Sequence, residues 1–457
     1  MDEIAFGTDG WRAESELVTA PRLHAIAQSV VDMLADDGDE GVPVGVGYDG
    51  RTGARDRASE LARVLAGGGH DVVFAERDCP TPTVAHAIVE RDLAGAFVVT
   101  ASHNPPSYSG VKWIPDDGAP ALPPVTERIV EGLREPDPLP EADHGQIREV
   151  DLIEPHVEAI LELVDADLSG LTVAYDAIHG SGRGVTDEVL ERAGADVQRL
   201  RCEHDPTFGG AEPNPEPEML SELADLVASG AVDLGISNDG DADRVRVVTE
   251  AGFVDASELL ATLYDVLLED QDGPAVRSVS TSSIVDRVAA AHGEETHEVP
   301  VGFKWVAQAM AEHDALVGGE ESGGLTIRGH VREKDGSLAA LLAASAHADQ
   351  PIQDRIAELH AEHGALQQDR ISVDCPDDQK DDAMGALEAA VPDEIAGTPV
   401  ERVNPADGVK LVLEDGTWLL IRPSGTEPKL RVYAEAETDD RIDELLAAGQ
   451  ELVTSVV

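Results

Sequence analysis

Lysine is scarce in this 457-residue chain. The sequence has six Lys and 27 Arg against 91 Asp and Glu, so its formal net charge at pH 7 is −58. A surface of that sign repels phosphate backbones and anionic lipids, which excludes nucleic-acid binding through a basic face. Any anionic ligand must therefore be held by a local basic pocket, and the positions of the few lysines become informative.

Cysteines are also few, and long apolar runs are absent. Cys79, Cys202 and Cys375 are odd in number and widely separated, which fits neither a zinc site nor a disulfide framework. The longest apolar stretch, residues 338–346, falls far short of the roughly 20 residues that cross a bilayer. The acidic N-terminus lacks the features of a signal peptide. We therefore expect a cytoplasmic protein with neither a membrane nor a nucleic acid as partner.

The acidic residues are spread along the whole chain, while 42% of the residues are hydrophobic. That fraction suffices for a folded core and argues against acidic disorder. The composition favours an enzyme from a halophile, because concentrated salt screens charges over about 3 Å and removes most self-repulsion. An acidic protein of ordinary habitat is the alternative.

A unit of strand, loop, helix and strand occurs three times, over residues 42–76, 171–200 and 275–300. Alternating strands and helices indicate α/β layers with parallel strands. The last part of the chain lacks this unit and ends in a hairpin-like pair, residues 418–424 and 430–437, followed by a helix. Seams in composition predict four domains, with bounds 1–145, 146–254, 255–364 and 365–457.

The segment TASHNPPSYSGVK, residues 100–112, follows the apolar strand GAFVV. It therefore lies at the carboxyl end of a strand, where open α/β sheets place their sites. Ser102 stands among small and polar residues, and Pro105 and Pro106 keep the loop from becoming helical. A turn without chemistry explains this segment equally well until other motifs support it.

The segment NDGDADR, residues 238–244, supplies that support. Asp239, Asp241 and Asp243 alternate after an apolar strand, so their carboxylates fall on one side of an extended loop. Oxygen-only ligands favour a hard cation such as Mg²⁺. An EF-hand is excluded because Arg244 occupies the glycine position and a strand pattern follows. A solvated acidic turn is the other alternative.

Four further segments carry groups suited to a phosphosugar. GGEESGG, residues 318–324, offers carboxylates and a hydroxyl to sugar hydroxyls, and RPSGTEPKLR, residues 422–431, offers a nest for a phosphate dianion. FGTDGWR, residues 6–12, adds an arginine on a glycine-containing loop, and VGFKW, residues 301–305, adds Lys304. Four of the six lysines lie in or beside these motifs, which indicates that chemistry retains them.

With five motifs in family order over the full length, the sequence resembles an α-D-phosphohexomutase, the superfamily of phosphoglucomutases, phosphomannomutases and phosphoglucosamine mutases. The resemblance implies an α/β protein of four domains around a central cleft. Three related α/β domains with mixed sheets precede a C-terminal α+β domain that is similar to the TATA-binding-protein fold. A monomer or a weak homodimer is expected.

The resemblance also implies roles for individual residues. Ser102 becomes the phosphoserine, and its phosphate shares a Mg²⁺ ion with the three aspartates. Lys112 is the first candidate for shuttling the hydroxyl proton, and His103 is the second. The remaining assignments are the transfer site, Arg12 and Arg244; sugar binding, Glu320, Ser322 and Lys304; and the non-reacting phosphate, Arg422, Ser424, Gly425 and Thr426.

The implied reaction moves a phosphoryl group between C1 and C6 of a hexose phosphate by way of a hexose 1,6-bisphosphate. Glucose 1-phosphate and glucose 6-phosphate are the expected partners, with mannose phosphates as further substrates. GEESGG and VGFKW look more like glucomutases than glucosamine mutases, but Gly324 replaces a histidine found in some members. The alternatives are a phosphoglucosamine mutase, a non-catalytic sugar-phosphate sensor and a salt-adapted phosphatase.

Overall fold

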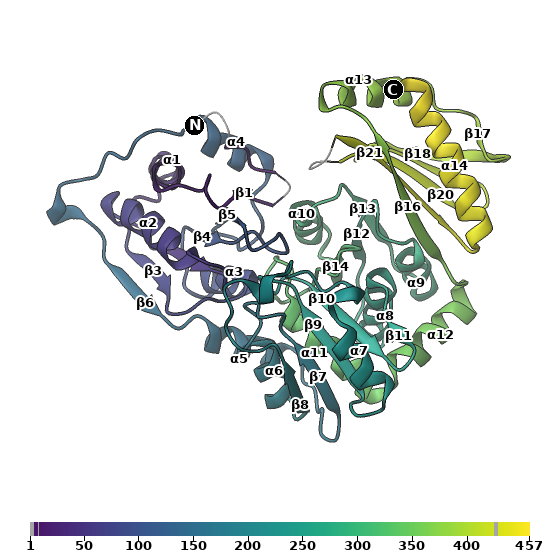
Figure 1. Ribbon diagram of the computed structural model, residues 1–457, viewed down its shortest axis with the longest axis horizontal. Coiled ribbons are helices and arrows are strands. Elements are labelled where there is room, and N and C mark those ends of the chain that lie inside the picture. The colour runs from purple at the N-terminus through teal and green to yellow at the C-terminus, as the bar shows by residue number, and fades with distance from the viewer. Residues whose placement is uncertain (1–3, 8, 425–427) are drawn as a thin grey trace.

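The computed structural model describes residues 4–7, 9–424 and 428–457. The chain forms four units in sequence order, with the first at the left of Figure 1, the second and third in the middle, and the fourth at the upper right. The prediction of three α/β units followed by a different fourth one is confirmed.

The first unit has a six-stranded mixed sheet in the order β1-β5-β4-β2-β3-β6. Strands β2, β3, β4 and β6 run parallel, and β5 runs antiparallel to β1 and β4. Every residue of β2 and β4 is buried, as expected for strands covered by helices on both faces. The elements are β1 (Trp11–Glu14), α1 (Ala20–Asp37), β2 (Val44–Tyr48), α2 (Ala54–Gly67), β3 (Val72–Ala75), α3 (Thr81–Glu90), β4 (Gly95–Val99), β5 (Tyr108–Pro115), α4 (Pro123–Glu131), η1 (Glu141–Asp143) and β6 (Ile147–Val150).

The second unit has a five-stranded sheet in the order β11-β10-β9-β7-β8, with β7, β8 and β9 parallel. Strand β10 follows the aspartate loop and pairs antiparallel with β9, as the strand pattern after Arg244 predicts. The elements are α5 (Ile153–Leu163), β7 (Thr172–Asp176), α6 (Thr186–Arg192), β8 (Asp196–Leu200), η2 (Phe208–Gly210), η3 (Pro217–Met219), α7 (Ser221–Ala228), β9 (Leu234–Asn238), β10 (Val245–Thr249) and β11 (Gly252–Phe253).

The third unit has a four-stranded sheet in the order β13-β12-β14-β15, in which only β15 is antiparallel among the described strands. Helix α11 packs on α6, β9 and β10 of the second unit. The elements are α8 (Ala256–Leu268), β12 (Ala275–Ser278), α9 (Ile284–His292), β13 (Thr296–Val299), α10 (Phe303–His313), β14 (Val317–Gly319), β15 (Leu325–Ile327), α11 (Gly336–Asp349) and α12 (Ile352–His363).

The fourth unit is an antiparallel sheet in the order β16-β21-β20-β19-β18-β17, on which α13 and α14 pack. The predicted hairpin is β20 and β21. The elements are β16 (Gln367–Asp374), η4 (Asp377–Gln379), α13 (Lys380–Ala389), β17 (Glu394–Ile395), β18 (Thr398–Asn404), β19 (Val409–Leu413), β20 (Trp418–Pro423), β21 (Lys429–Ala436) and α14 (Asp439–Val456).

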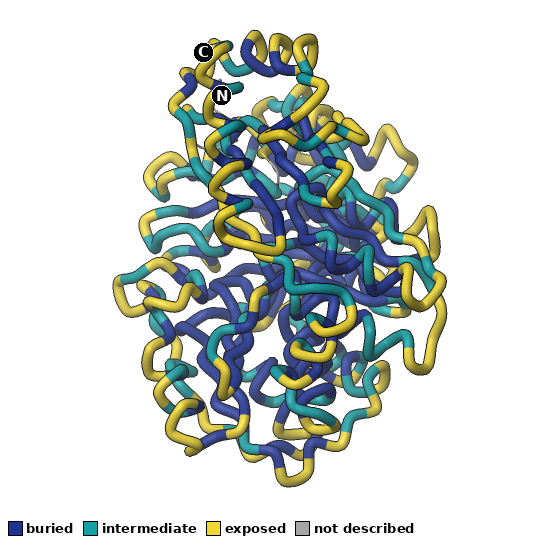
Figure 2. Tube along the Cα trace, turned by 90° about the vertical axis from the view of Figure 1, so that its right-hand side faces the viewer, coloured by how far each residue is buried: buried dark blue, intermediate teal, exposed yellow. Residues whose placement is uncertain are grey.

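The buried residues show how the units are joined. One continuous hydrophobic core runs through the first three units, whereas the fourth unit has a core of its own. In Figure 2 the buried trace fills the middle of the molecule and the exposed loops lie at its edge. No helix among the described residues is long and apolar enough to cross a membrane.

The contact between the third and fourth units is built on a buried carboxylate. Glu298 of β13 accepts hydrogen bonds from Lys410 Nζ and Arg277 Nη1, both at 2.6 Å, and from the Asn404 amide. The Lys410 side chain is 1% exposed, and its Nζ lies 4.2 Å from the centre of the Trp418 ring. Burial lowers the pKa of Lys410 to about 8, even though Glu298 opposes the shift. Glu298 is therefore the charge that makes the burial of this lysine tolerable.

We predict that Glu298→Gln destabilises the docking of the fourth unit by about 3–5 kcal/mol, because a buried ammonium loses its counter-charge. Urea unfolding followed by Trp fluorescence measures this loss. Glu295→Gln, at an exposed position two residues after the C-cap Gly293 of α9, is the control and should change the free energy of unfolding by less than about 0.5 kcal/mol. Equal effects of the two substitutions would contradict the prediction.

Candidate active site

Ser102 lies in the loop after β4, with a buried side chain and a backbone φ of +50°. A non-glycine residue in this left-handed region is uncommon and marks a loop held by its surroundings. Its Oγ donates a hydrogen bond to Asp239 Oδ2 at 2.9 Å and lies 3.3 Å from His103 Nδ1. The serine hydroxyl therefore points at the aspartate loop.

A buried ion pair between Arg51 and Asp49 is hydrogen-bonded to the serine loop. Arg51 Nε donates to Asp49 Oδ2 at 2.7 Å, and Arg51 Nη2 donates to the Ser102 carbonyl at 2.8 Å. Thr100 Oγ1 also donates to Asp49 Oδ2, at 2.7 Å, and accepts the Ser102 N–H. Asp49 and Arg51 were not predicted as site residues. Their position directly after β2, a buried strand of the same sheet as β4, is the sequence feature that could have identified them.

The aspartate loop follows β9 and meets the serine loop closely. A Cβ at Gly240 would lie 2.7 Å from the Ser102 carbonyl, so only glycine permits this approach. Asp239, Asp241 and Asp243 are fully buried, and one carboxylate oxygen of each lies within 4.8 Å of the others. Their alternation in sequence therefore brings three ligands to one point.

This donor set fits a hard divalent cation. Within the described part of the chain, Asp241 Oδ1 and Asp243 Oδ1 are buried without a hydrogen-bond partner. Burial raises the pKa of Asp239 well above its usual value, and the charges of Asp243 and Asp241 raise it further. A cation at this point would offset the repulsion and satisfy the two open oxygens, since all the ligands are oxygens.

Lys112 on β5 and Lys334 after β15 bring positive charge to the same carboxylates. Lys112 Nζ lies 2.7 Å from Asp9 Oδ2, 3.2 Å from Asp241 Oδ2 and 3.3 Å from Asp243 Oδ2. Lys334 Nζ lies 3.1 Å from Asp243 Oδ2. Lys334 and Asp9 had no role predicted from the sequence, although Lys334 is one of only six lysines and Asp9 lies within FGTDGWR.

These contacts set the protonation of Lys112 and its neighbours. Burial lowers the pKa of Lys112, but Asp241, Asp9 and Asp243 outweigh it and hold the pKa well above its usual value. The Lys112 side chain therefore carries a proton at neutral pH. Burial lowers the pKa of His103 to about 3, with Arg244 and Arg12 adding to the shift, so its imidazole is neutral.

Two arginines complete the charge balance. Arg12 Nη2 pairs with Asp9 Oδ2 at 3.0 Å, and Arg12 Nη1 donates to Asn104 Oδ1 at 3.3 Å. The backbone N–H of Arg244 donates to Asp239 Oδ1 at 3.3 Å, and the Nε of its side chain lies 3.8 Å from Asp243 Oδ1. Both guanidinium groups thus stand at the rim of the carboxylate cluster, on the loops where the motifs place them.

The loop after β14 presents Glu320 toward the same region. Glu320 Oε1 accepts the Gly302 N–H at 2.8 Å. Burial raises the pKa of Glu320 to about 7, with Glu321 adding to the shift and Lys334 opposing it. Glu321 accepts hydrogen bonds from the hydroxyls of Ser278, at the end of β12, and Ser280, just after it. Ser322 is half-buried. Lys304 is the second residue of α10, and its Nζ lies 5.9 Å from the centre of the Trp305 ring.

The phosphate motif lies on the fourth unit, between β20 and β21. Arg422 pairs with Asp407 Oδ2 through Nε and Nη2, both at 2.9 Å, and the same oxygen accepts the Val301 N–H at 3.2 Å. Ser424 is buried, and its carbonyl accepts from Lys380 Nζ at 2.6 Å. Gly425 and Thr426 lie outside the described residues. Asp407, which sequence analysis missed, thus ties Arg422 to the VGFKW segment.

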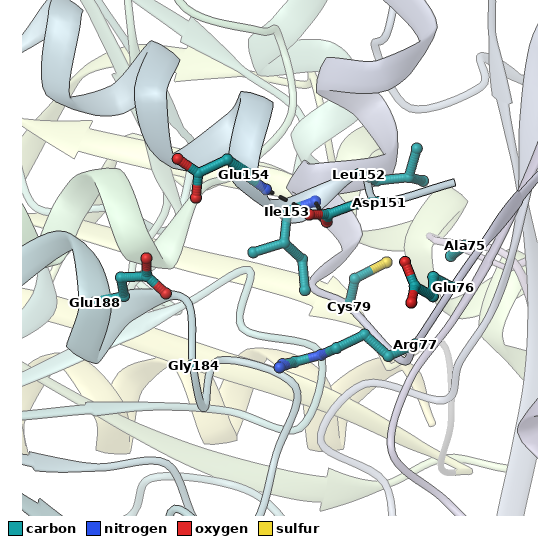
Figure 3. Close-up of a pocket in the computed structure, with 10 residues that line it drawn as sticks. All are labelled: Ala75, Glu76, Arg77, Cys79, Asp151, Leu152, Ile153, Glu154, Gly184 and Glu188. Carbon is teal, nitrogen blue, oxygen red and sulfur yellow. Dashed lines mark hydrogen bonds between the residues drawn. The ribbon is translucent and has the colours of Figure 1, made fainter. Parts of the chain in front are cut away.

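A separate hollow of about 390 Å³ lies at the seam of the first two units (Figure 3). Its lining holds one basic side chain, Arg77, whose Nη2 donates to the Arg183 carbonyl. Burial raises the pKa of Cys79 to about 12, so this thiol is not reactive. Four carboxylates line the hollow and would repel an anionic sugar: Glu76, Asp151, Glu154 and Glu188.

Family models match nearly the whole chain. The phosphoglucomutase/phosphomannomutase alpha/beta/alpha domains I, II and III match residues 3–139, 154–252 and 255–363, and the C-terminal domain matches residues 371–450.

Individual relatives agree with these matches. A probable phosphoglucosamine mutase of Methanopyrus kandleri is 34% identical, with 96% of this chain and 95% of the relative covered. A phosphoglucomutase/phosphomannomutase of Thermococcus kodakarensis is 30% identical, with 98% of each chain covered.

The fold also matches a crystal structure of Aspergillus fumigatus N-acetylphosphoglucosamine mutase in complex with GlcNAc-6P and magnesium. The TM-score is 0.61 at 15% identity, with 100% of this chain and 96% of the other covered. With matches to all four domain models and relatives aligned almost end to end, the chain belongs to the α-D-phosphohexomutase superfamily.

Proposed function

We propose that the protein interconverts the 1-phosphate and 6-phosphate of a hexose through a phosphoserine at Ser102. Glucose phosphates are the first proposed substrates and mannose phosphates the second. The observation that carries the proposal is the 2.9 Å hydrogen bond from Ser102 Oγ to Asp239, inside a buried cluster of carboxylates and cations. A nucleophile, a metal-ligand set and fixed positive charge together are what phosphoryl transfer requires.

The proposed reaction has two halves. In the first, the bond between phosphorus and Ser102 Oγ breaks, and a bond forms from phosphorus to the free hydroxyl oxygen of the hexose monophosphate. The resulting hexose 1,6-bisphosphate turns end for end. In the second half its other phosphoryl group returns to Ser102 Oγ, which leaves the isomeric monophosphate.

Asp239, Asp241 and Asp243 are proposed to hold Mg²⁺ together with an oxygen of the phosphoserine. When bound, the ion would offset negative charge on the phosphoryl oxygens, which is the main contribution a metal makes to such transfers. Arg12 and Arg244 add fixed positive charge at the rim of the same cluster.

Lys112 is proposed to give its proton to the leaving Ser102 oxygen and to take up the proton that the attacking sugar hydroxyl loses, so the ammonium is restored in each half-reaction. Its raised pKa and burial beside the aspartates support the proton-bearing form. His103 is the second candidate, as a neutral imidazole 3.3 Å from the serine hydroxyl.

The non-reacting phosphate and the sugar hydroxyls are proposed to bind to different units of the protein. Arg422 and Ser424, with Gly425 and Thr426, hold the phosphate that does not react, and Lys304 contributes charge nearby. One phosphate site that accepts either end of the molecule lets a single serine serve both halves of the reaction. Glu320 and Ser322 are proposed to bind the sugar hydroxyls.

Phosphoglucosamine mutase activity is the second candidate function, with glucosamine phosphate as the substrate. The specific observation in its favour is the 34% identity to a relative called a probable phosphoglucosamine mutase. Glu320, when ionised, can accept from a sugar hydroxyl or an ammonium group, so the loop motif by itself does not separate the two substrates.

The acidic surface is proposed to adapt the enzyme to salt. With a net charge of −58, self-repulsion is weakened when the Debye length falls to about 3 Å at 1 M salt. Assays in molar KCl therefore match the conditions for which the composition is suited.

We predict that the protein incubated with glucose 1,6-bisphosphate gains the mass of one phosphoryl group, and that Ser102→Ala does not. The variant should lose activity by at least about a thousandfold, because the acceptor oxygen is gone. Intact-mass spectrometry and a coupled assay measure both effects. Ser109→Ala, a buried hydroxyl on β5, is the control and should still take the phosphoryl group. Full activity without modification at Ser102 would refute the proposed function.

We predict that glucose 1-phosphate turns over faster than mannose 1-phosphate and glucosamine 1-phosphate when the rates are measured in parallel in molar KCl. The comparison of kcat/KM reports directly on how the sugar loop discriminates. If glucosamine phosphate has the highest kcat/KM, the glucose assignment is wrong and the second candidate replaces it.

We predict that KM for the sugar phosphate falls as pH rises through about 7 and then levels off. Glu320, with its pKa raised to about 7, is protonated below this pH and ionised above it, and only the ionised form accepts two hydroxyl hydrogen bonds. Glu320→Gln should lose about ten- to a hundredfold in kcat/KM and show no such change in KM. The same pH dependence in the variant would assign the titration to another group.

A further inference from the structure

A second cluster of metal-ligating side chains lies away from the three aspartates. His156 on α5 and His330 in the loop before α11 both place Nε2 at 2.7 Å from Asp335 Oδ2. One ligand atom from each of the three residues lies within 4.8 Å of the others. Two imidazoles and a carboxylate therefore meet at one point.

The cluster is buried, and other contacts orient its members. The side chains of His156, His330 and Asp335 are 0%, 3% and 0% exposed. Asp335 Oδ1 accepts the Ser337 N–H at 2.8 Å at the start of α11, which leaves Oδ2 directed at the histidines. Thr83 Oγ1 lies 2.9 Å from His156 Nδ1 and fixes that ring. Partners on the far side of each ligand are typical of metal sites.

A third imidazole borders the cluster. The His86 ring on α3 has its centre 5.4 Å from that of His156. Its Nδ1 is buried and has no hydrogen-bond partner among the described residues. An unpaired buried imidazole nitrogen is costly unless something binds it, so His86 adds a further imidazole with an open nitrogen beside the cluster.

We propose that His156, His330 and Asp335 bind a transition-metal cation of the zinc type, with the His86 ring beside them. Imidazole nitrogens with one carboxylate suit zinc, whereas magnesium prefers oxygen ligands. The site is separate from the aspartate loop in both residues and ligand chemistry. Because all three ligand side chains are buried away from solvent, we assign the ion a structural role rather than a catalytic one.

The location of the cluster explains what such an ion would do. His86 belongs to the first α/β unit, His156 to the second and Asp335 to the third. Asp335 directly follows Lys334, whose Nζ lies 3.1 Å from Asp243 in the active site. A bound cation would hold the three units together and fix the loop that carries Lys334 to the aspartates.

The test is zinc retention by the full-length protein. The protein is stripped with a chelator, loaded with zinc chloride in excess Mg²⁺, desalted and analysed for metal content. We expect one zinc per chain, a rise in Tm on loading, and at least about tenfold weaker binding in His156→Gln and His330→Gln. Asp239→Asn should retain the zinc, which separates this site from the aspartate loop.

His292→Gln is the matched control, because His292 also pairs with a carboxylate, Asp265, at 2.8 Å, but lies at a partly exposed position on α9. X-ray absorption of the zinc-loaded wild type should show nitrogen ligands at about 2.0–2.1 Å and decides the question even if the variants do not fold. Failure to retain zinc, an oxygen-only spectrum, or unchanged zinc binding in both histidine variants would overturn the proposal and leave a metal-free hydrogen-bonded cluster.

Discussion

The rest of the site depends on the ion pairs between the Lys112 ammonium and the carboxylates around it. The ammonium stands within 3.3 Å of Asp9, Asp241 and Asp243, and it is almost completely buried. Buried carboxylates on neighbouring loops repel one another and are tolerated only when opposite charge is held among them. Because Lys112 lies on β5 of the first unit and two of its partners lie on the loop after β9 of the second, this pairing also aligns the serine with the proposed metal ligands.

The composition of the chain makes sense around this cluster. The surface is strongly acidic, yet Lys112, Lys334 and Lys410 are all buried. The first two stand at the aspartates, and the third joins the fourth unit to Glu298. Half of the six lysines are therefore placed in the interior, beside carboxylates, rather than on the acidic surface.

The separate core of the fourth unit is relevant to the proposed reaction. The first three units share one hydrophobic core and carry the serine, the aspartates and the Glu320 loop. The fourth unit carries the Arg422 segment on its own core, and it meets the third through the ionic contacts of Glu298 and a small apolar cluster around Val279, Trp418 and Leu420. Such a small, mixed junction is easier to adjust than a continuous apolar core, which suits the proposed turning of the substrate between two half-reactions.

Much of this arrangement could be predicted from local patterns. The three repeated units and the β20–β21 hairpin follow from local patterns, and so does the position of the Ser102 loop and of the aspartate loop at the end of a strand. The two strands, β4 and β9, belong to different sheets, so the meeting of these loops was expected from the family resemblance and not from a local pattern. Strand β6 belongs to the first sheet although it lies beyond the predicted domain bound at residue 145. Its pairing with β3 is a long-range contact that leaves no local signal in the sequence, so the bound could not take it into account. Asp49 and the histidine cluster were missed for the same reason, since their partners are distant in sequence.

The most direct test of the account is a double-mutant cycle on Lys112→Met and Asp241→Asn, with the free energy of unfolding measured in urea after metal removal. If the ammonium compensates the carboxylate, Lys112→Met alone costs about 3–5 kcal/mol. The loss of unfolding free energy in the double variant is then smaller than the sum of the losses in the two single variants by about 0.5–3 kcal/mol. Strictly additive losses would show that the two charges do not depend on each other and would contradict the account.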